Sequence, residues 1–225
     1  MLKRVMNHAL KQGGNSAINR ERLKRQLSTF DRVNLGCGDL FVENWLNIGL
    51  FSNRFITYGT VKKVGAAYAL HFDLTKDLPL ETGTVVYLYA SHFIEHLAFD
   101  QAHEFLRRCH RVMRQEGILR LTTPDLELWI RKYSENDLEF FERFYQIEQS
   151  YPALATKGQI LVGQIQGWTH RWLYDYSSLE DILVRAGFSH VAKRKALESL
   201  IPDIEKLEPR SEFRLMETLC VEARK

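Results

Sequence analysis

Short apolar runs alternate along the chain with longer segments whose apolar residues recur at helical spacing. The short runs are rich in β-branched and aromatic residues, which is typical of buried strands. The clearest is Thr-Val-Val-Tyr-Leu-Tyr-Ala at 84–90. The predicted strands span residues 32–35, 44–50, 67–73, 84–90, 118–122, 190–194 and 214–222. Strands that alternate with helices predict an α/β fold with a mostly parallel sheet.

The predicted helices differ in how clearly they begin and end. Residues 100–114 carry one apolar face and are followed by a glycine, and residues 177–186 begin at a serine and also end before a glycine. Residues 126–149 read as a helix rich in aromatic side chains. Residues 151–176 contain three glycines, so that segment is predicted to be irregular.

The first predicted strand runs into a turn that contains Gly36, Cys37, Gly38 and Asp39. A strand that ends in such a turn leaves backbone N–H groups unpaired, and glycine allows a ligand to come close to them. We therefore expect a site for a nucleotide-type cofactor near the start of the fold. Cys37 is interpreted as a small residue of this turn and not as a nucleophile.

Composition limits the classes that fit. The chain has 225 residues, 45% of them hydrophobic and 26% charged, which suits one large domain or a domain with an appendage. A net charge of +3 is too mild to indicate nucleic-acid binding. The three cysteines are widely spaced, which favours a reducing cytoplasm. No apolar run approaches the ~20 residues of a membrane span, and no secretory signal opens the sequence.

Basic residues crowd the first part of the chain, so residues 1–30 are predicted to form a basic helical extension and residues 31–225 the main domain. A helix over 16–30 would place three aliphatic residues partly on one side and the bases elsewhere. Two interpretations stay open for this helix. It caps the domain with a solvated face, or it contacts an anionic membrane surface or an acidic partner.

Four stretches in order carry a family resemblance. They are Asn-Leu-Gly-Cys-Gly-Asp at 34–39, Asp-Leu-Thr at 73–75 with Leu-Pro-Leu at 78–80, Ser-His-Phe-Ile-Glu-His-Leu at 91–97, and residues 106–125. In this order and spacing the chain resembles the class I S-adenosylmethionine-dependent methyltransferases over about 32–191. More narrowly, it resembles a type-11-like bacterial branch found among surface-polysaccharide genes.

The resemblance implies a Rossmann-like, seven-stranded, mostly parallel sheet with helices on both faces and the last strand antiparallel. It implies S-adenosylmethionine as cofactor, bound across the carboxyl ends of the first strands. The residues expected to bind it are Gly36, Cys37, Gly38, Asp39, Asp73, Leu74 and Ser91. Asp39 would meet the ammonium group and Asp73 the adenine amino group, although each aspartate also suits a plain turn. Leu74 would pack on the adenine or belong to the core.

One position departs from the family pattern. The second strand usually ends in an acid that binds both ribose hydroxyls, and Gly49 stands there. Loss of those hydrogen bonds would cost on the order of 1–3 kcal/mol. Asn47 or Asn53 could replace the acid. If neither does, the alternative is a degenerate methyltransferase-like fold that serves as a binding or regulatory module.

The stretch from His92 to His96 also reads His-x-x-Glu-His, with Glu95 as its acid. On an α-helix this spacing places two imidazoles one turn apart, as in inverted zinc-protease motifs, so a zinc hydrolase is a remote alternative. The position after a buried strand favours a polar pair at the sheet end instead. We therefore predict no metal.

Transfer of a methyl group to oxygen needs an aligned acceptor, and a base can remove its proton. The candidates for that base are His92, Asp125 after the fifth strand, and His170. Residues 168–176 mix aromatic and polar side chains, which suits a wall for a sugar or another ring, or equally an aromatic plug. The acceptor is expected to be a small molecule or glycan, methylated at oxygen. The sequence does not determine the oligomeric state.

Overall fold

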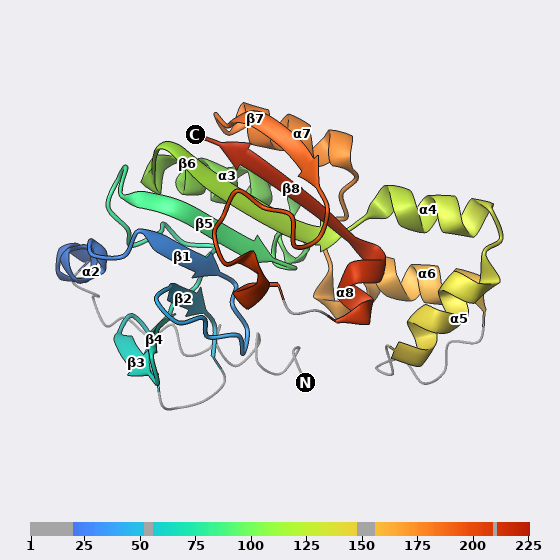
Figure 1. The fold of residues 1–225 in the computed structure, drawn as a ribbon, viewed down its shortest axis with the longest axis horizontal. Helices are drawn as coiled ribbons and strands as arrows, with labels where there is room; N and C mark the ends of the chain where they lie inside the picture. The colour runs from blue at the N-terminus through green and yellow to red at the C-terminus, as the bar shows by residue number, and fades with distance from the viewer. Residues whose placement is uncertain (1–19, 52–55, 148–155, 209–210) are drawn as a thin grey trace.

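The structure is a computed structural model that describes residues 20–51, 56–147, 156–208 and 211–225, with the backbone alone at position 213. Eight strands form one sheet in the order β3-β4-β2-β1-β5-β6-β8-β7 (Figure 1). In chain order the strands are β1 (Arg32–Leu35), β2 (Leu46–Gly49), β3 (Val61–Val64), β4 (Ala67–His71), β5 (Val85–Ser91), β6 (Met113–Pro124), β7 (Ser189–Arg194) and β8 (Thr218–Arg224).

The predicted Rossmann-like α/β fold is confirmed, with eight strands rather than seven. Strands β4, β2, β1, β5 and β6 run parallel to one another. The last strand, β8, lies antiparallel between β6 and β7, as predicted. The added strand is β3, which pairs antiparallel with β4 at the edge of the sheet. Its pattern is half-buried with two adjacent lysines, so the sequence carries little apolar signal for it.

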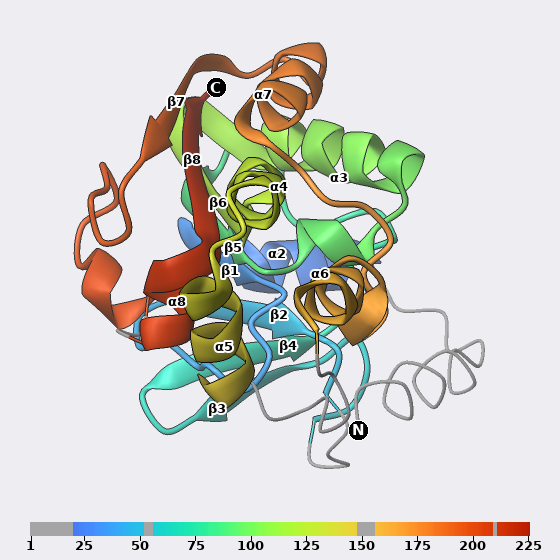
Figure 2. The ribbon, with the colours of Figure 1, turned by 90° about the vertical axis from the view of Figure 1, so that its right-hand side faces the viewer.

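One apolar core fills the space between the sheet and the helices on one face. Helix α3 (Phe99–Val112) and helix α7 (Tyr176–Arg185) lie side by side there (Figure 2). Helix α2 (Arg20–Leu27) adds Leu23 and Leu27 to the same core. The opposite face is covered by the segment 195–208, whose Ile201, Ile204 and Leu207 pack with Tyr89 of β5.

The aromatic segment predicted as one helix is two helices. Helix α4 (Leu126–Ser134) ends before a short connection, and helix α5 (Leu138–Ile147) follows. The break occurs because Asn136 takes a left-handed conformation and the Asp137 carboxylate accepts from the Phe140 N–H at 3.0 Å. Residues 148 and 149 of the predicted helix lie outside the described residues.

Three other boundaries differ from the prediction. Helix α6 (Lys157–Gln166) lies inside the segment predicted to be irregular, because Thr156 and Gln159 form a capping box. Helix α7 is capped by Asp175 instead of a serine. The first part of the predicted final strand is helix α8 (Glu212–Glu217). Helices α4, α5 and α6 share an aromatic cluster beside the carboxyl end of β6 (Figure 1).

The predicted basic extension is only partly described. Helix α2 lies within the helix predicted over 16–30, with its leucines buried and most of its charged side chains exposed. Residues 1–19 lie outside the described residues, so the division into an extension and a main domain stays a prediction, as does membrane contact. None of the helices in the described ranges has the length and apolarity that a membrane crossing requires. Cytoplasmic location likewise stays a prediction.

Candidate active site

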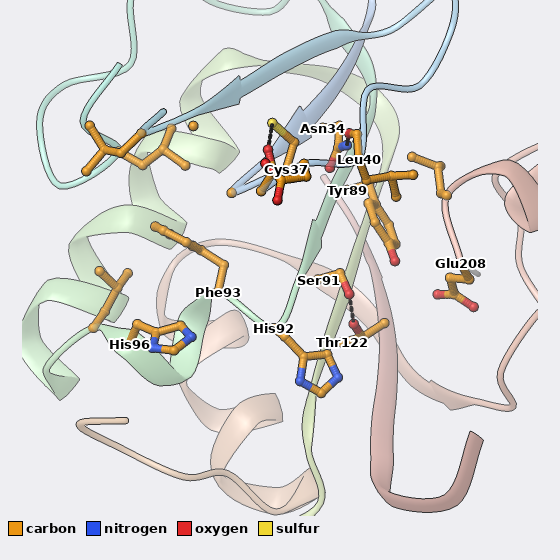
Figure 3. Close-up of a pocket in the computed structure, with 18 of the residues that line it drawn as sticks. Asn34, Cys37, Leu40, Tyr89, Ser91, His92, Phe93, His96, Thr122 and Glu208 are labelled. Carbon is orange, nitrogen blue, oxygen red and sulfur yellow. Dashed lines mark hydrogen bonds between the residues drawn. The ribbon is translucent and has the colours of Figure 1, made fainter. Parts of the chain in front are cut away.

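A cavity of about 760 Å³ opens where the parallel strands end (Figure 3). One wall comes from the glycine turn after β1, the end of β2 and the loop after β4. The other comes from the ends of β5 and β6, the start of β8, the segment 195–208 and helix α8. All seven residues predicted to bind the cofactor line this cavity. Of the three candidate bases, His92 lines it, and Asp125 and His170 do not.

The glycine turn is held tightly against β2. The N–H groups of Gly36 and Cys37 both donate to the Ile48 carbonyl, at 2.8 and 3.2 Å. Gly36 has φ +67°, and a Cβ there would lie 2.7–2.9 Å from Phe93 side-chain atoms. Gly38 has φ +53° with open space around it. Only a residue without a side chain fits at Gly36, because Phe93 fills the space where a Cβ would lie. The expectation of unpaired N–H groups is therefore wrong for Gly36 and Cys37, whose N–H groups are bonded to β2, and the open part of the turn is at Gly38.

The Cys37 thiol is no candidate nucleophile. It lies in the glycine turn, 3.6 Å from the Gly38 carbonyl oxygen, and is almost fully buried. Burial raises the pKa of this thiol, since the thiolate would lose its water shell. The thiol therefore stays protonated, which agrees with its interpretation as a small residue of the turn.

The loop after β4 brings an acid and an apolar side chain to the cavity. Asp73 makes a turn of its own: one carboxylate oxygen accepts from the N–H and the hydroxyl of Thr75, at 2.9 and 2.7 Å. No hydrogen bond reaches its second oxygen from the described part of the chain, and Asp73 lines the cavity. Leu74 is buried in the main core and lines the cavity as well. Both residues thus keep a structural role alongside the predicted contact to adenine.

Gly49 lies on the cavity wall at the end of β2, and Asn47 cannot replace the missing acid. The Asn47 amide oxygen accepts from Asn34 and from the Val42 N–H, at 3.1 and 3.0 Å. Its amide nitrogen donates to three backbone carbonyls. Every polar atom of Asn47 is therefore used inside the fold. Asn53, the other suggested replacement, lies outside the described residues.

His92 follows β5 and faces two buried acids and a hydroxyl. Its φ is +46°, a left-handed conformation that turns the imidazole toward β8. Nδ1 lies 3.3 Å from Glu95 Oε1, and Nε2 lies 3.1 Å from the Thr218 hydroxyl and 3.8 Å from Glu217 Oε1. Ser91, beside it in the chain, accepts from the Thr122 hydroxyl at 2.8 Å (Figure 3). The imidazole is thus held between an acid and a hydroxyl at the cavity wall.

The two acids behind His92 are both buried without full hydrogen bonding. Oε1 of Glu95 and Oε1 of Glu217 have no hydrogen-bond partner among the described residues. Oε2 of Glu217 accepts from the Trp129 indole and the Gln164 amide, each at 3.3 Å. Burial raises the pKa of Glu95, and it raises the pKa of Glu217 to about 8. At neutral pH Glu217 is therefore largely protonated, and the site holds less negative charge than its sequence indicates.

Asp125 and His170 have structural roles. Asp125 caps α4 through the Leu128 N–H at 3.3 Å and pairs with Lys193 at 3.1 Å. His170 Nδ1 lies 2.7 Å from the Gln164 carbonyl oxygen, and burial lowers its pKa. Neither residue lines the cavity.

The zinc-hydrolase alternative is wrong in its geometry. Residues Ile94–His96 form a single 3-10 turn (η1), so His92 and His96 do not sit one turn apart on an α-helix. Within the described ranges, the group of three such side chains whose potential ligand atoms all lie within 4.8 Å of one another is Glu95, His96 and His170, and it does not include His92. His96 Nδ1 lies 3.2 Å from the Thr169 hydroxyl, and the Glu95 carbonyl accepts from Arg171. This group connects η1 to the segment before α7.

Sequence reasoning missed the residues that the C-terminal part brings to the site. Glu217, Thr218 and Arg214 come from α8 and the start of β8, and the last two line the cavity. Their positions lay inside a predicted strand, and a strand pattern carries no signal for a helix that ends in a buried acid. The signal that was present is the Ser211 cap, whose hydroxyl accepts from the Arg214 N–H at 3.3 Å.

Residues 33–121 match the family model described as a methyltransferase domain, less than half of the chain. No curated protein sequence matched. Human N-acetylserotonin methyltransferase, solved with S-adenosylmethionine, is similar in structure with a TM-score of 0.50 at 12% identity, over 92% of this chain and 52% of that enzyme. A methyltransferase from Archaeoglobus fulgidus has a TM-score of 0.49 at 16% identity, over 98% and 99%. One from Mesorhizobium loti has 0.46 at 16%, over 93% and 99%.

At these identities the solved structures show the fold alone, and of these three the human enzyme has the TM-score that supports it. The match to the methyltransferase-domain model begins in β1 and ends in β6, so it contains the glycine turn, the loop after β4 and the end of β5. The open space at Gly38 leaves room for a ligand beside this turn. Residues 33–121 are accordingly similar to a methyltransferase domain, in a fold that the human enzyme shares.

Proposed function

We propose that the protein methylates an oxygen atom of a small-molecule or glycan acceptor, with His92 as the base. The observation that carries this proposal is the arrangement around His92. Its Nδ1 lies 3.3 Å from Glu95 Oε1, its Nε2 lies 3.1 Å from the Thr218 hydroxyl, and His92 and Thr218 line the cavity. An imidazole with an acid at one nitrogen and a hydroxyl at the other is arranged to take a proton from oxygen.

In this proposal the cofactor is bound partly by backbone groups and partly by side chains. The amino-acid end of the cofactor would lie beside the turn of Gly36 and Gly38, with open space at Gly38 and with Asp39 and Ser91 also on the cavity wall. Asp73 and Leu74 would hold the adenine, by a hydrogen bond and by apolar contact. S-adenosylmethionine supplies, when bound, a methyl group on a sulfonium sulfur.

His92 would remove the acceptor proton at Nε2. With its proton on Nδ1, which lies 3.3 Å from Glu95 Oε1, the imidazole has its free electron pair on Nε2, 3.1 Å from the Thr218 hydroxyl. An acceptor hydroxyl that takes the place of the Thr218 hydroxyl would pass its proton to Nε2. S-adenosylmethionine, when bound, would supply the methyl group, whose bond to the sulfonium sulfur would be replaced by a bond to the acceptor oxygen, leaving S-adenosylhomocysteine. Glu95 then balances the imidazolium charge, and its burial strengthens that interaction.

The acceptor side of the cavity suits a polar ring. Arg171 lines the cavity and its guanidinium donates to Gln101 at 3.0 Å. Trp172, the next residue in the chain, lies outside the cavity lining; it is 46% exposed and packs against Phe99, with ring centroids 5.2 Å apart. An exposed indole next to a hydrogen-bonding arginine is a combination that stacks on a sugar face and binds its hydroxyls. This pairing supports a glycan acceptor, in line with the resemblance to the polysaccharide-associated branch.

The test is transfer of radiolabelled methyl from S-adenosylmethionine to a panel of sugars and phenols, with product mapping of the methylated atom. For any acceptor found, His92→Gln is expected to lower kcat by about 10²- to 10⁴-fold while binding of S-adenosylhomocysteine is unchanged. Asp125→Asn and His170→Gln are the comparison variants, because the sequence also suggested these two residues as bases and neither lines the cavity. A loss of that size in either rival and not in His92→Gln would overturn the assignment, and a product methylated at nitrogen or carbon would overturn the oxygen target.

A further inference from the structure

The cavity is lined by an arginine, Arg214, that has no ion-pair partner among the described residues. Arg214 of α8 lines the cavity, and its Nη1 is buried with no hydrogen-bond partner in the described part of the chain. No carboxylate of a described residue comes within the 4.0 Å of an ion pair with this guanidinium. Burial lowers the pKa of Arg214, yet an arginine stays charged at any physiological pH. The cavity therefore contains a guanidinium whose Nη1 is still available to donate to a bound group.

The acids near Arg214 are engaged elsewhere. Glu217, three residues further along, directs one oxygen to Trp129 and Gln164, and burial keeps it largely protonated at neutral pH. Glu208 also lines the cavity, but both of its oxygens accept from Arg120, at 2.6 and 2.9 Å. Burial raises the pKa of Tyr89, so that hydroxyl remains neutral. Glu217 interacts electrostatically with Arg214, but none of these groups forms a hydrogen bond with its Nη1.

Arg120 is a useful comparison, because it is a fully buried arginine with a purely structural role. The Arg120 guanidinium is fully buried and donates to Glu208 twice, to Glu222 and to the carbonyls of Lys195 and Glu198. All three of its nitrogens have partners. Leaving a buried donor unpaired is costly, so the contrast between Arg120 and Arg214 indicates that Arg214 is kept for a group that arrives with a ligand.

We propose that Arg214 is the carboxylate-binding residue of the cavity. A guanidinium fork matches the two oxygens of a carboxylate or of a phosphate. A carboxylate is favoured over a phosphate because the Asp39 carboxyl group also lines the cavity and would repel the second charge of a phosphate. Two carboxylates fit the proposed function on which this inference rests. One is the amino-acid end of the cofactor, and the other is an acidic group on the acceptor, such as that of a uronic acid.

The test compares ligands that differ only in the carboxylate-bearing part. Titrations would measure S-adenosylhomocysteine and 5′-methylthioadenosine, which lacks the amino-acid end, against wild type, Arg214→Met and Arg214→Lys. A second arm titrates glucuronate and glucose into protein loaded with S-adenosylhomocysteine. Arg185→Met is the matched control, because that arginine is exposed on α7 and pairs with Asp181. Thermal unfolding checks that each variant is folded.

If the carboxylate is the cofactor's, Arg214→Met weakens S-adenosylhomocysteine by about 10- to 100-fold and leaves 5′-methylthioadenosine within twofold, with Arg214→Lys in between. If it is the acceptor's, both nucleosides are unaffected and the preference for glucuronate over glucose is lost. Equal weakening of both nucleosides, or no change in either arm, overturns the proposal. Wild-type protein that binds neither nucleoside would instead overturn the cofactor site itself, so the two failures are distinguishable.

Discussion

The two walls of the cavity differ in what they are made of. The wall formed by β1, β2 and β4 offers glycines, backbone groups and an aspartate that forms its own turn, and Asn47 keeps its polar atoms inside the fold. The wall formed by β5, β6, β8 and α8 holds His92 between two buried acids, with an unpaired arginine nearby. The first wall is therefore expected to bind a ligand by the shape of its backbone, whereas the second contains buried ionisable side chains.

The comparison shows why the walls tolerate change differently. A backbone cradle fails when a side chain enters it, because the space is filled. A wall of buried charges fails when one charge is removed, because the remaining charge is left without a partner in a medium that cannot solvate it. Substitutions in the first wall should therefore affect cofactor affinity, and substitutions in the second should affect stability, pH dependence and chemistry.

The largest effect is expected from Arg120→Met. Arg120 pairs with Glu208 at 2.6 Å and Glu222 at 3.2 Å, and it anchors the segment 195–208 that forms part of the second wall. Removing it leaves two buried carboxylates and should lower the free energy of unfolding by about 3–5 kcal/mol. Urea denaturation measures this. Arg185→Met, which removes an exposed pair, should change it by less than about 1 kcal/mol. Equal effects of the two substitutions would contradict the buried-charge account.

Next comes Gly36→Val in the first wall. A side chain at this position would collide with Phe93 and would have to adopt φ +67°. S-adenosylhomocysteine affinity should fall by at least about 100-fold, which calorimetric titration measures. Gly65→Ala is the control, because Gly65 has φ +61°, open space around it and no place on the cavity wall. A Gly36→Val protein that binds like wild type would show that the glycine turn is not the cofactor site.

Glu217→Gln should change how the stability of the protein depends on pH, which tests the buried charge of the second wall. Burial raises the pKa of Glu217 from 4.5 to about 8, so the folded protein keeps a proton that the unfolded chain releases. This contribution to stability is fully present below about pH 4.5 and is lost as pH rises through about 8. Glutamine has no proton to lose. The variant should therefore gain on wild type as pH rises, by on the order of 3 kcal/mol at pH 8.5.

The measurement is urea denaturation of both proteins at pH 5, 7 and 8.5. Wild type should lose stability across this series relative to the variant. Since Glu95 is present in both proteins, the difference between them isolates Glu217. Parallel curves would mean that Glu217 is ionised in the folded state, and the wall would then hold more charge than we infer.

The smallest effect is a gain, from Gly49→Asp. A Cβ at Gly49 would meet the Cys37 sulfur and the Phe51 ring at 3.4 Å, close to ordinary contact. The new carboxylate should accept from both ribose hydroxyls and raise S-adenosylhomocysteine affinity by up to about 10-fold. A 2′,3′-dideoxyribose analogue should show no gain. Unchanged affinity for both ligands would mean that the ribose is held by another group.

The elements that sequence reasoning placed well are those with a local signal. The run at 84–90 became β5, and the helix at 100–114 became α3, because apolar spacing alone determines which face is buried. The turn at Gly36 and Gly38 was predicted for the same reason, since positive φ favours glycine locally. Strand β3 and helix α6 were missed. The first has no apolar alternation, and the second begins at a capping box inside a glycine-rich segment.

The candidate site divides in the same way. Sequence by itself determined the glycine turn, Asp73 and the candidacy of His92, because each follows a strand whose carboxyl end faces the cofactor side in a parallel sheet. The sequence did not rank the three candidate bases, His92, Asp125 and His170. Only the tertiary structure separated them, because β8 enters the sheet antiparallel to β6 and brings Thr218 to His92, 126 positions earlier in the chain. The charge state of Glu217 and the lack of a partner for Arg214 come from burial by such distant segments, which no local pattern encodes.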